Sequence, residues 1–236
     1  MIRSKSTPIV VQILILVKLI GLVSTAYAQS GEPDVVLRHW MDKARSINSL
    51  AATFDELRFL DKKMAPIVSH GELWMSKQKL FRWQLGNPPT TIAIREPDGR
   101  FCFIDAKHRK AKVWAREAME VLHFSPRNES TSEKGFRSVE EFYQHFRLKS
   151  VVEDSREPHV FNIELELRDR WASIFILRVN ATICLADGFL RGFVVFMRDG
   201  SRYEMRVNTI QLNPKLEDQL FKFDLSSYQI ESMNGR

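Results

Sequence analysis

Few of the residues that carry catalytic chemistry stand close together in this sequence. The six histidines lie at positions 39, 70, 108, 123, 145 and 159, and no two have the spacing of metal ligands. G-x-S-x-G, Walker, G-x-G-x-x-G and H-E-x-x-H motifs are absent from the chain. The adjacent Glu140 and Glu141 suit the first turn of a helix, where negative charge is favoured by the helix dipole. We therefore expect no enzyme, no metal and no cofactor.

The two cysteines, Cys102 and Cys184, leave two alternatives open. In an oxidising compartment they could form a disulfide, which would close a long loop and stabilise the fold by about 4 kcal/mol. They could equally be two buried free thiols in strands. The sequence alone does not decide between the two.

The aromatic residues are more informative, because most of them fall in runs that are typical of strands. These residues are Trp74, Phe81, Trp83, Phe101, Phe103, Trp114, Phe161, Trp171, Phe175, Phe189, Phe193 and Phe196. One interpretation is that they fill an ordinary core. The other is that the sheet curls around a volume larger than its side chains can fill, so that the aromatic side chains line an apolar cavity.

The elements that carry these residues are mostly strands. One helix is predicted at about 34–47 from its helical spacing. Strand patterns follow at 71–76, 80–85, 101–105, 160–167, 173–180, 189–197 and 202–212. The dipeptides Asp187-Gly188 and Asp199-Gly200 are hairpin turn signals between the last three runs. We expect a mainly β fold whose antiparallel sheet has one apolar face.

The strands are interrupted at about 116–149, and this interruption is expected to supply an inserted helical lid. Helical patterns occur at 116–124 and at 138–148, and the second begins with a capping box in which Glu141 follows Ser138. The lid residues expected to face the sheet are Met119, Leu122, Phe142 and Phe146. A long antiparallel sheet must cover its apolar face, and inserted helices provide that cover.

The first 28 residues have the pattern of a secretory signal peptide. Basic residues precede an apolar run at 9–23, which is followed by the small-x-small sequence Ala26-Tyr27-Ala28. A retained membrane anchor is the alternative, but polar residues interrupt a run already shorter than the ~20 residues that a spanning helix needs. We expect cleavage after Ala28 and a soluble, exported single domain over 29–236.

The charge balance argues against nucleic acid as a partner. The chain has 35 basic and 29 acidic residues, and three of the basic residues lie in the first 28 positions. The remainder therefore has a net charge of +3, too small and too dispersed for a protein that follows a phosphate backbone. With 44% hydrophobic and 27% charged residues, the composition is that of a globular protein.

A series of short motifs adds a family resemblance. In chain order these are Ala51-Ala52-Thr53-Phe54, Gly71-Glu72-Leu73-Trp74, Leu80-Phe81-Arg82-Trp83, Pro88, Asp98-Gly99-Arg100, Phe101-Cys102-Phe103-Ile104-Asp105, Asn213-Pro214 and Phe221-Lys222-Phe223-Asp224. Their order and spacing resemble those of the periplasmic outer-membrane lipoprotein carrier family, the LolA-like proteins, over about 34–230.

The resemblance implies an unclosed antiparallel β-barrel that curls around an apolar cavity and carries triacylated lipoproteins between the two membranes. It also implies a monomeric carrier without a cofactor, an inner-membrane ABC transporter as donor and an outer-membrane lipoprotein as acceptor. The residues expected to line the cavity are Leu73, Trp74, Phe81, Trp83, Phe101 and Phe103. The alternatives are a sensor of lipid or lipoprotein with the same shape, a carrier of another acylated lipid and, third, an envelope hydrolase.

One position departs from the family pattern. Between the two tryptophan motifs the family usually has an arginine that reaches the lid helices, and this chain has Lys77 followed by Gln78 and Lys79. Lysine keeps the positive charge but lacks the planar fork that binds two carbonyl groups at once. We expect Lys77 to act as a lid latch, with a solvated turn lysine as the alternative.

Overall fold

The computed structural model describes residues 32–61, 64–77, 80–115, 138–170 and 172–233, and the fold is built mainly of strands. The helices are α2 (Glu32–Ala44), α4 (Val139–His145), α5 (Ala172–Phe175) and the 3-10 helix η1 (Asp218–Phe221). The strands are β1 (Ser49–Phe59), β2 (Ile67–Ser76), β3 (Phe81–Leu85), β4 (Thr91–Arg95), β5 (Phe101–Asp105), β6 (Lys110–Trp114), β7 (Phe146–Glu153), β8 (Val160–Leu167), β9 (Ile176–Cys184), β10 (Leu190–Met197), β11 (Arg202–Leu212) and β12 (Gln229–Met233).

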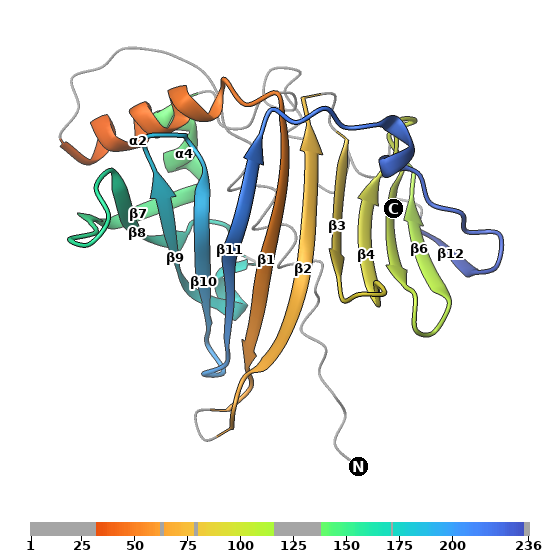
Figure 1. Ribbon diagram of the computed structural model, residues 1–236. Helices are drawn as coiled ribbons and strands as arrows, with labels where there is room; N and C mark the ends of the chain where they lie inside the picture. The colour runs from red at the N-terminus through yellow and green to blue at the C-terminus, as the bar shows by residue number, and fades with distance from the viewer. Residues whose placement is uncertain (1–31, 62–63, 78–79, 116–137, 171, 234–236) are drawn as a thin grey trace.

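The strands form one sheet that is open at both edges. Its order is β12-β6-β5-β4-β3-β2-β1-β11-β10-β9-β8-β7, so the two meanders meet where β1 pairs with β11 (Figure 1). The pairs are antiparallel, apart from β12, which runs parallel to β6. Since β12 and β7 stand at opposite ends of this order, the barrel is unclosed. The predicted fold class, a mainly β chain with an unclosed antiparallel sheet covered by helices, is confirmed.

The sheet carries an apolar layer on each of its two faces. We call the face covered by α2 and α4 the inner face, and the larger core lies there. The β1 residues Leu50, Ala52 and Phe54 show the two-residue period of a strand with one buried face. On the outer face, a smaller cluster of β4, β5 and β6 side chains is packed by Phe223 and Tyr228 from the segment that leads to β12.

The helix predicted at 138–148 is shorter than expected. Its N-cap is as predicted, because the Ser138 hydroxyl accepts a hydrogen bond from the backbone N–H of Glu141 at 3.3 Å. The helix ends at His145, and Phe146 begins β7 by pairing with Leu167 of β8. Phe146 is therefore a buried strand residue rather than a lid-helix residue, since strand pairing replaces the helix at this point.

The sheet has two ends, seen along the direction of its strands, and only one of them is covered by α2. At this covered end the β9–β10 turn packs against the end of α2, so that a Cβ on Gly188 would lie 2.3 Å from the Ala44 nitrogen. Gly188 also has a φ of 73°, which favours glycine. At the opposite end lie the β1–β2 hairpin tip, α5 and the β10–β11 turn (Figure 1). We call this second end the open end.

The hairpins predicted at the two Asp-Gly turns are confirmed by the antiparallel pairs β9–β10 and β10–β11. The strand predicted at 173–180 is wrong at its start, because α5 occupies Ala172–Phe175 and β9 begins at Ile176. In the ranges that the structure describes, no helix is both long enough and apolar enough to span a bilayer.

Candidate functional site

The inner face is built around the glycine of the G-x-L-W motif. A Cβ on Gly71 would lie 2.3 Å from the Phe54 ring and 2.8 Å from the Gln84 carbonyl oxygen, so glycine lets the phenyl ring of β1 lie flat across β2. Leu73 is buried on the same face. Trp74 points to the outer face, where the Arg82 guanidinium lies 5.9 Å from its ring centre. Trp74 therefore does not line the inner face as expected, because adjacent strand residues alternate.

The L-F-x-W motif supplies the centre of the inner face. Phe81 and Trp83 are two residues apart on β3, and both are buried on this face, as the strand period requires. The Trp83 ring stacks on Phe54 with centroids 6.1 Å apart and planes 17° from parallel. Burying such a pair removes a large apolar area from water and adds a preferred ring geometry.

The inner face continues onto β5 and becomes less buried there. Phe101 and Phe103 are partly buried and pack against the same core. The Phe101 ring lies 5.8 Å from the ring of Trp114 on β6. Five of the six residues expected to line a cavity therefore share the inner face, and the structure packs them against other side chains.

Two helices cover part of this apolar layer. Leu37, Trp40 and Met41 of α2 are buried in the core, and so is Phe142 of α4. The hydroxyl of Tyr143 on α4 donates a hydrogen bond to the Asp34 carboxylate on α2, which joins the two helices. Burial, reinforced by this bond, raises the pKa of Tyr143. The other two expected lid residues, Met119 and Leu122, lie outside the described residues.

A polar cluster lies on the inner face beside the open end. The Glu56 side chain is fully buried, and its oxygens accept hydrogen bonds from the Tyr203 hydroxyl at 3.1 Å and from the Arg58 guanidinium. Burial, together with the Glu56 charge, raises the pKa of Tyr203. The Arg58 side chain keeps 30% exposure, so the cluster marks the boundary between core and solvent.

Sequence analysis missed this cluster, although one signal was available. Glu56 occupies the next inner position after Leu50, Ala52 and Phe54, and a carboxylate in that series predicts a buried and paired acid. The contact between Tyr143 and Asp34 had no comparable signal, because 109 positions separate the two residues.

Lys77 lies in the turn after β2, with its side chain exposed. Its backbone N–H donates to the Asn48 carbonyl at 2.8 Å, which ties the turn to the segment between α2 and β1. Within the described ranges the structure records no hydrogen bond or ion pair from its ammonium group. Lys77 is thus beside the helix-covered end of the sheet, and its latch role stays a prediction.

Both cysteines are buried free thiols, so the second of the two alternatives is correct. Cys102 belongs to the outer-face cluster on β5, and Cys184 lies at the end of β9. Six strands separate β5 from β9 in the sheet, whereas a disulfide needs Cα atoms within about 7 Å. Burial, with a smaller contribution from the Glu96 charge, raises the pKa of Cys102 to about 12. Such a thiol is a poor nucleophile at neutral pH.

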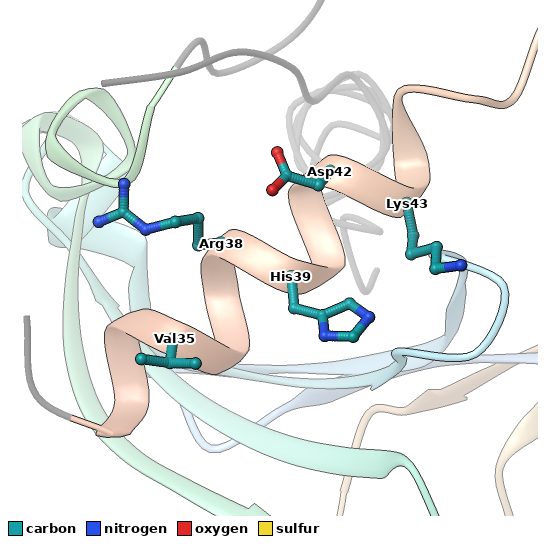
Figure 2. Close-up of a pocket in the computed structure, with 5 residues that line it drawn as sticks. All are labelled: Val35, Arg38, His39, Asp42 and Lys43. Carbon is teal, nitrogen blue, oxygen red and sulfur yellow. The ribbon is translucent and has the colours of Figure 1, made fainter. Parts of the chain in front are cut away.

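A shallow hollow of about 480 Å³ lies along the solvent-facing side of α2. Figure 2 shows the residues that line it projecting from this one helix, and they are Val35, Arg38, His39, Asp42 and Lys43. Among the described residues, the lining of this hollow comes from α2 alone. No group of three or more metal-binding side chains occurs among the described residues.

The inner face is a continuous apolar layer from β5 to β8, and the Glu56–Tyr203 hydrogen bond lies at one end of it. In chemical terms this defines an unclosed sheet with a helix-covered apolar face.

Comparison with known proteins supports this architecture and goes no further than the fold. No protein-family model and no curated protein matches the chain. An uncharacterized conserved protein from Thermus thermophilus is similar in structure, with a TM-score of 0.50, 12% identity, and coverage of 86% of this chain and 100% of that chain. At this identity the likeness shows a shared fold.

Two further structures have lower scores. The Pseudomonas aeruginosa MucA/MucB complex has a TM-score of 0.45 and 11% identity, with coverage of 86% of this chain and 64% of that chain. A LolA superfamily protein from Nitrosomonas europaea has a TM-score of 0.36 and 10% identity, with coverage of 78% of this chain and 96% of that chain.

Proposed function

We propose that the protein binds the acyl chains of lipoproteins on its inner face and carries them through the periplasm from the inner to the outer membrane. The observation that carries the proposal is the continuous apolar layer of the inner face, which runs from β5 to β8 beneath α2 and α4. Each CH₂ group removed from water contributes about 0.8 kcal/mol, so an acyl anchor needs such a surface to cross an aqueous space.

Binding requires the covering helices to move. Phe142 is fully buried against the inner face, and the Phe54–Trp83 stack fills the centre of that face. An acyl chain therefore has to displace α2 and α4 and replace their apolar contacts with its own. Because the apolar gain is offset by the lost contacts, the complex is tight enough to shield the chain and weak enough to release it.

The proposed partners follow from the family resemblance. They are acylated lipoproteins as cargo, an inner-membrane ABC transporter that loads the carrier and an outer-membrane lipoprotein that unloads it. In this scheme Lys77 lies beside the loop that leads from α2 to β1, where an ammonium group can hold the cover closed. Lys77→Leu should then speed cargo release and Lys77→Arg should slow it. Equal release rates in wild type and both variants would indicate that Lys77 is a solvated turn lysine without a latch role.

Export to the periplasm is part of the proposal and rests on the first 28 residues, which lie outside the described residues. N-terminal sequencing of the protein from the periplasmic fraction should read Gln29-Ser30-Gly31. An intact Met1 terminus in the membrane fraction would contradict cleavage.

The decisive experiment is to identify what co-purifies with the protein from the periplasm. Native mass spectrometry should find acylated lipoprotein bound, and hydrolysis of its ester-linked chains should release it. Transfer of bound lipoprotein to outer-membrane vesicles would distinguish a carrier from a sensor, which holds its ligand. A bound lipid without a polypeptide would indicate another acylated cargo, and a preparation free of acyl chains would contradict the proposal.

A further inference from the structure

Exposed apolar side chains gather at the open end of the sheet. Ten large apolar residues are exposed in the part of the chain that the structure describes, and seven of them belong to the β1–β2 hairpin or to the segment formed by α5 and the start of β9, each 49–65% exposed. They are Leu60, Met64, Ile67, Val68, Ile174, Phe175 and Leu177. Single exposed apolar residues are ordinary, but a group on adjacent tips marks an interaction surface.

The β10–β11 turn lies between these two groups and joins them into one surface. On one side, Arg202 at the start of β11 pairs with Phe59 at the end of β1. On the other, Arg198 donates hydrogen bonds to α5, from its backbone N–H to the Phe175 carbonyl at 2.9 Å and from Nε to the Ser173 carbonyl at 2.7 Å. The strand order β2-β1-β11-β10-β9 brings the β1–β2 and β10–β11 turns close together at the bottom of Figure 1, and the Arg198 hydrogen bonds attach α5 to the second of these turns.

The positive charge of the chain is concentrated in the same three segments. Residues 58–68, 168–177 and 198–202 together contain seven basic and three acidic residues, a net charge of +4. All residues after position 28 have a net charge of +3, so those outside the three segments have a net charge of −1. Acids and bases of these segments are both engaged locally. Asp169 accepts from the Ala172 N–H and Asp199 from the Ser201 N–H, while Arg58 is paired with Glu56 and Arg202 lies 4.0 Å from Glu204.

We propose that this open end docks on the surface of an anionic lipid bilayer. The apolar side chains enter the interface between headgroups and acyl chains, and the surrounding arginine side chains contact lipid phosphates. Exposed apolar residues with interspersed basic ones on one edge are the pattern of a peripheral membrane contact. The excess of positive charge favours anionic lipid over a second copy of this chain, whose open end carries the same charge.

This inference goes beyond the proposed function, because it concerns the open end of the sheet and does not depend on which ligand the inner face binds. Docked in this way, the Glu56–Arg58–Tyr203 cluster would lie close to the headgroups, and the inner face would open toward the bilayer. The direction of the strands would then be roughly along the membrane normal.

Vesicle sedimentation with the purified protein tests the apolar contribution. The probe is a phosphatidylcholine vesicle with about one-third phosphatidylglycerol, compared with phosphatidylcholine alone. Wild type should sediment with the anionic vesicles. The double variant Ile174→Ser/Phe175→Ser should lose at least about tenfold in partitioning, which corresponds to about 1.4 kcal/mol. The matched control Val35→Ser/Val152→Ser removes two equally exposed residues elsewhere and should change partitioning by less than about twofold.

A second set of variants tests the charge. Arg168→Gln/Arg170→Gln should weaken binding to anionic vesicles by about fivefold for each charge removed. The control Lys43→Gln/Lys222→Gln removes the same charge from two exposed positions away from the open end and should bind as wild type does. Raising the salt concentration should abolish the difference between the two sets, because the attraction is screened.

Three outcomes would overturn the inference. The first is wild type that stays in the supernatant when the anionic vesicles sediment, and the second is an equal loss of binding in each variant set and its control. The third is wild type that binds native inner-membrane vesicles and ignores protein-free ones, which would assign the surface to a membrane protein. Melting temperatures check that each variant is folded, and binding of a hydrophobic dye to the inner face separates a failure here from a failure of the proposed function.

Discussion

The hydroxyl of Tyr143 donates a hydrogen bond to the carboxylate of Asp34, and this contact ties α4 to α2 above the inner face. The two residues are 109 positions apart, so the bond closes a long loop between the segments that cover the apolar layer. A hydrogen bond to a charged acceptor contributes about 1.5–3 kcal/mol, the lower end applying where solvent reaches it. This bond of modest strength adds to the apolar contacts of Leu37, Trp40 and Phe142 that hold the cover.

The first prediction concerns this bond. Tyr143→Phe should keep the ring and remove the hydroxyl, so the cover should open more often while the sheet stays intact. Binding of a hydrophobic dye to the inner face should become faster, and the free energy of unfolding should fall by about 1–2 kcal/mol. Tyr228→Phe is the control, because the Tyr228 ring packs against Phe223 on the outer face. Equal dye kinetics in the two variants would show that the bond does not hold the cover.

Alkaline pH should weaken the fold through Tyr143 and Tyr203. Burial is the main cause that raises the pKa of both hydroxyls, and neighbouring carboxylates add to it. A tyrosine in the unfolded chain ionises near pH ~10, whereas the same tyrosine in the folded protein stays protonated to a higher pH. Between these two pKa values the unfolded chain gains stability by losing its proton, so the free energy of unfolding falls as the pH rises above that of the unfolded tyrosine. The free energy of unfolding should therefore decline above about pH 10, and less steeply in Tyr143→Phe. Denaturant titrations at a series of pH values measure the free energy of unfolding. If its pH dependence were the same in wild type and in Tyr143→Phe, Tyr143 would not be one of the groups responsible.

Much of the sheet could be predicted from local pattern, because alternation reports which face is buried. The limits of β5, β8 and β11 agree with the predicted runs at 101–105, 160–167 and 202–212. The motif at Gly71 also has a physical reason in the space that Phe54 needs. The alternation of apolar residues predicted which side chains are buried. It did not show how closely these side chains pack against one another on the inner face.

The errors occurred where a long-range contact decides the local structure. At 173–175 the apolar run looked like a strand, but α5 forms there and is bound by Arg198 of the β10–β11 turn. Phe175, expected either to fill the core or to line an apolar cavity, is instead 59% exposed at the open end. The contacts of α5 are not visible in local periodicity. The error at Trp74 is of another kind, because the residue was assigned to the inner face by its motif although its position beside Leu73 on a strand excludes that.

The packing at Gly71 gives a test of the inner face that does not depend on cargo. Gly71→Ala should place a methyl group 2.3 Å from the Phe54 ring, and overpacking of this kind costs about 1–3 kcal/mol. Phe54→Ala should cost about 3–5 kcal/mol through the cavity that it leaves beside Trp83. In the double variant the added methyl group should cost less than in wild type, because the ring that it meets is gone and only the close approach to the Gln84 carbonyl oxygen at 2.8 Å is left. Denaturant unfolding of the four proteins measures this coupling, and additive losses would mean that Phe54 does not occupy the space above Gly71.

The last prediction is that the protein keeps both cysteines as free thiols even after export to an oxidising compartment. Cys102 is fully buried, and the raised pKa of about 12 keeps its thiol protonated at neutral pH. Cys184 is also buried, and six strands lie between them in the sheet. Protein recovered from an oxidising compartment should therefore keep both thiols, and alkylating reagents should label them only after unfolding.

Cys102→Ala and Cys184→Ala should each lower the free energy of unfolding by about 1 kcal/mol through lost packing. Removal of a native disulfide would cause a larger loss, about 2–5 kcal/mol. Mass spectrometry of the alkylated protein under denaturing conditions counts the free thiols directly. A species lighter by two hydrogens, with neither cysteine labelled, would contradict the free-thiol state and would require β5 and β9 to lie closer together than the sheet order permits.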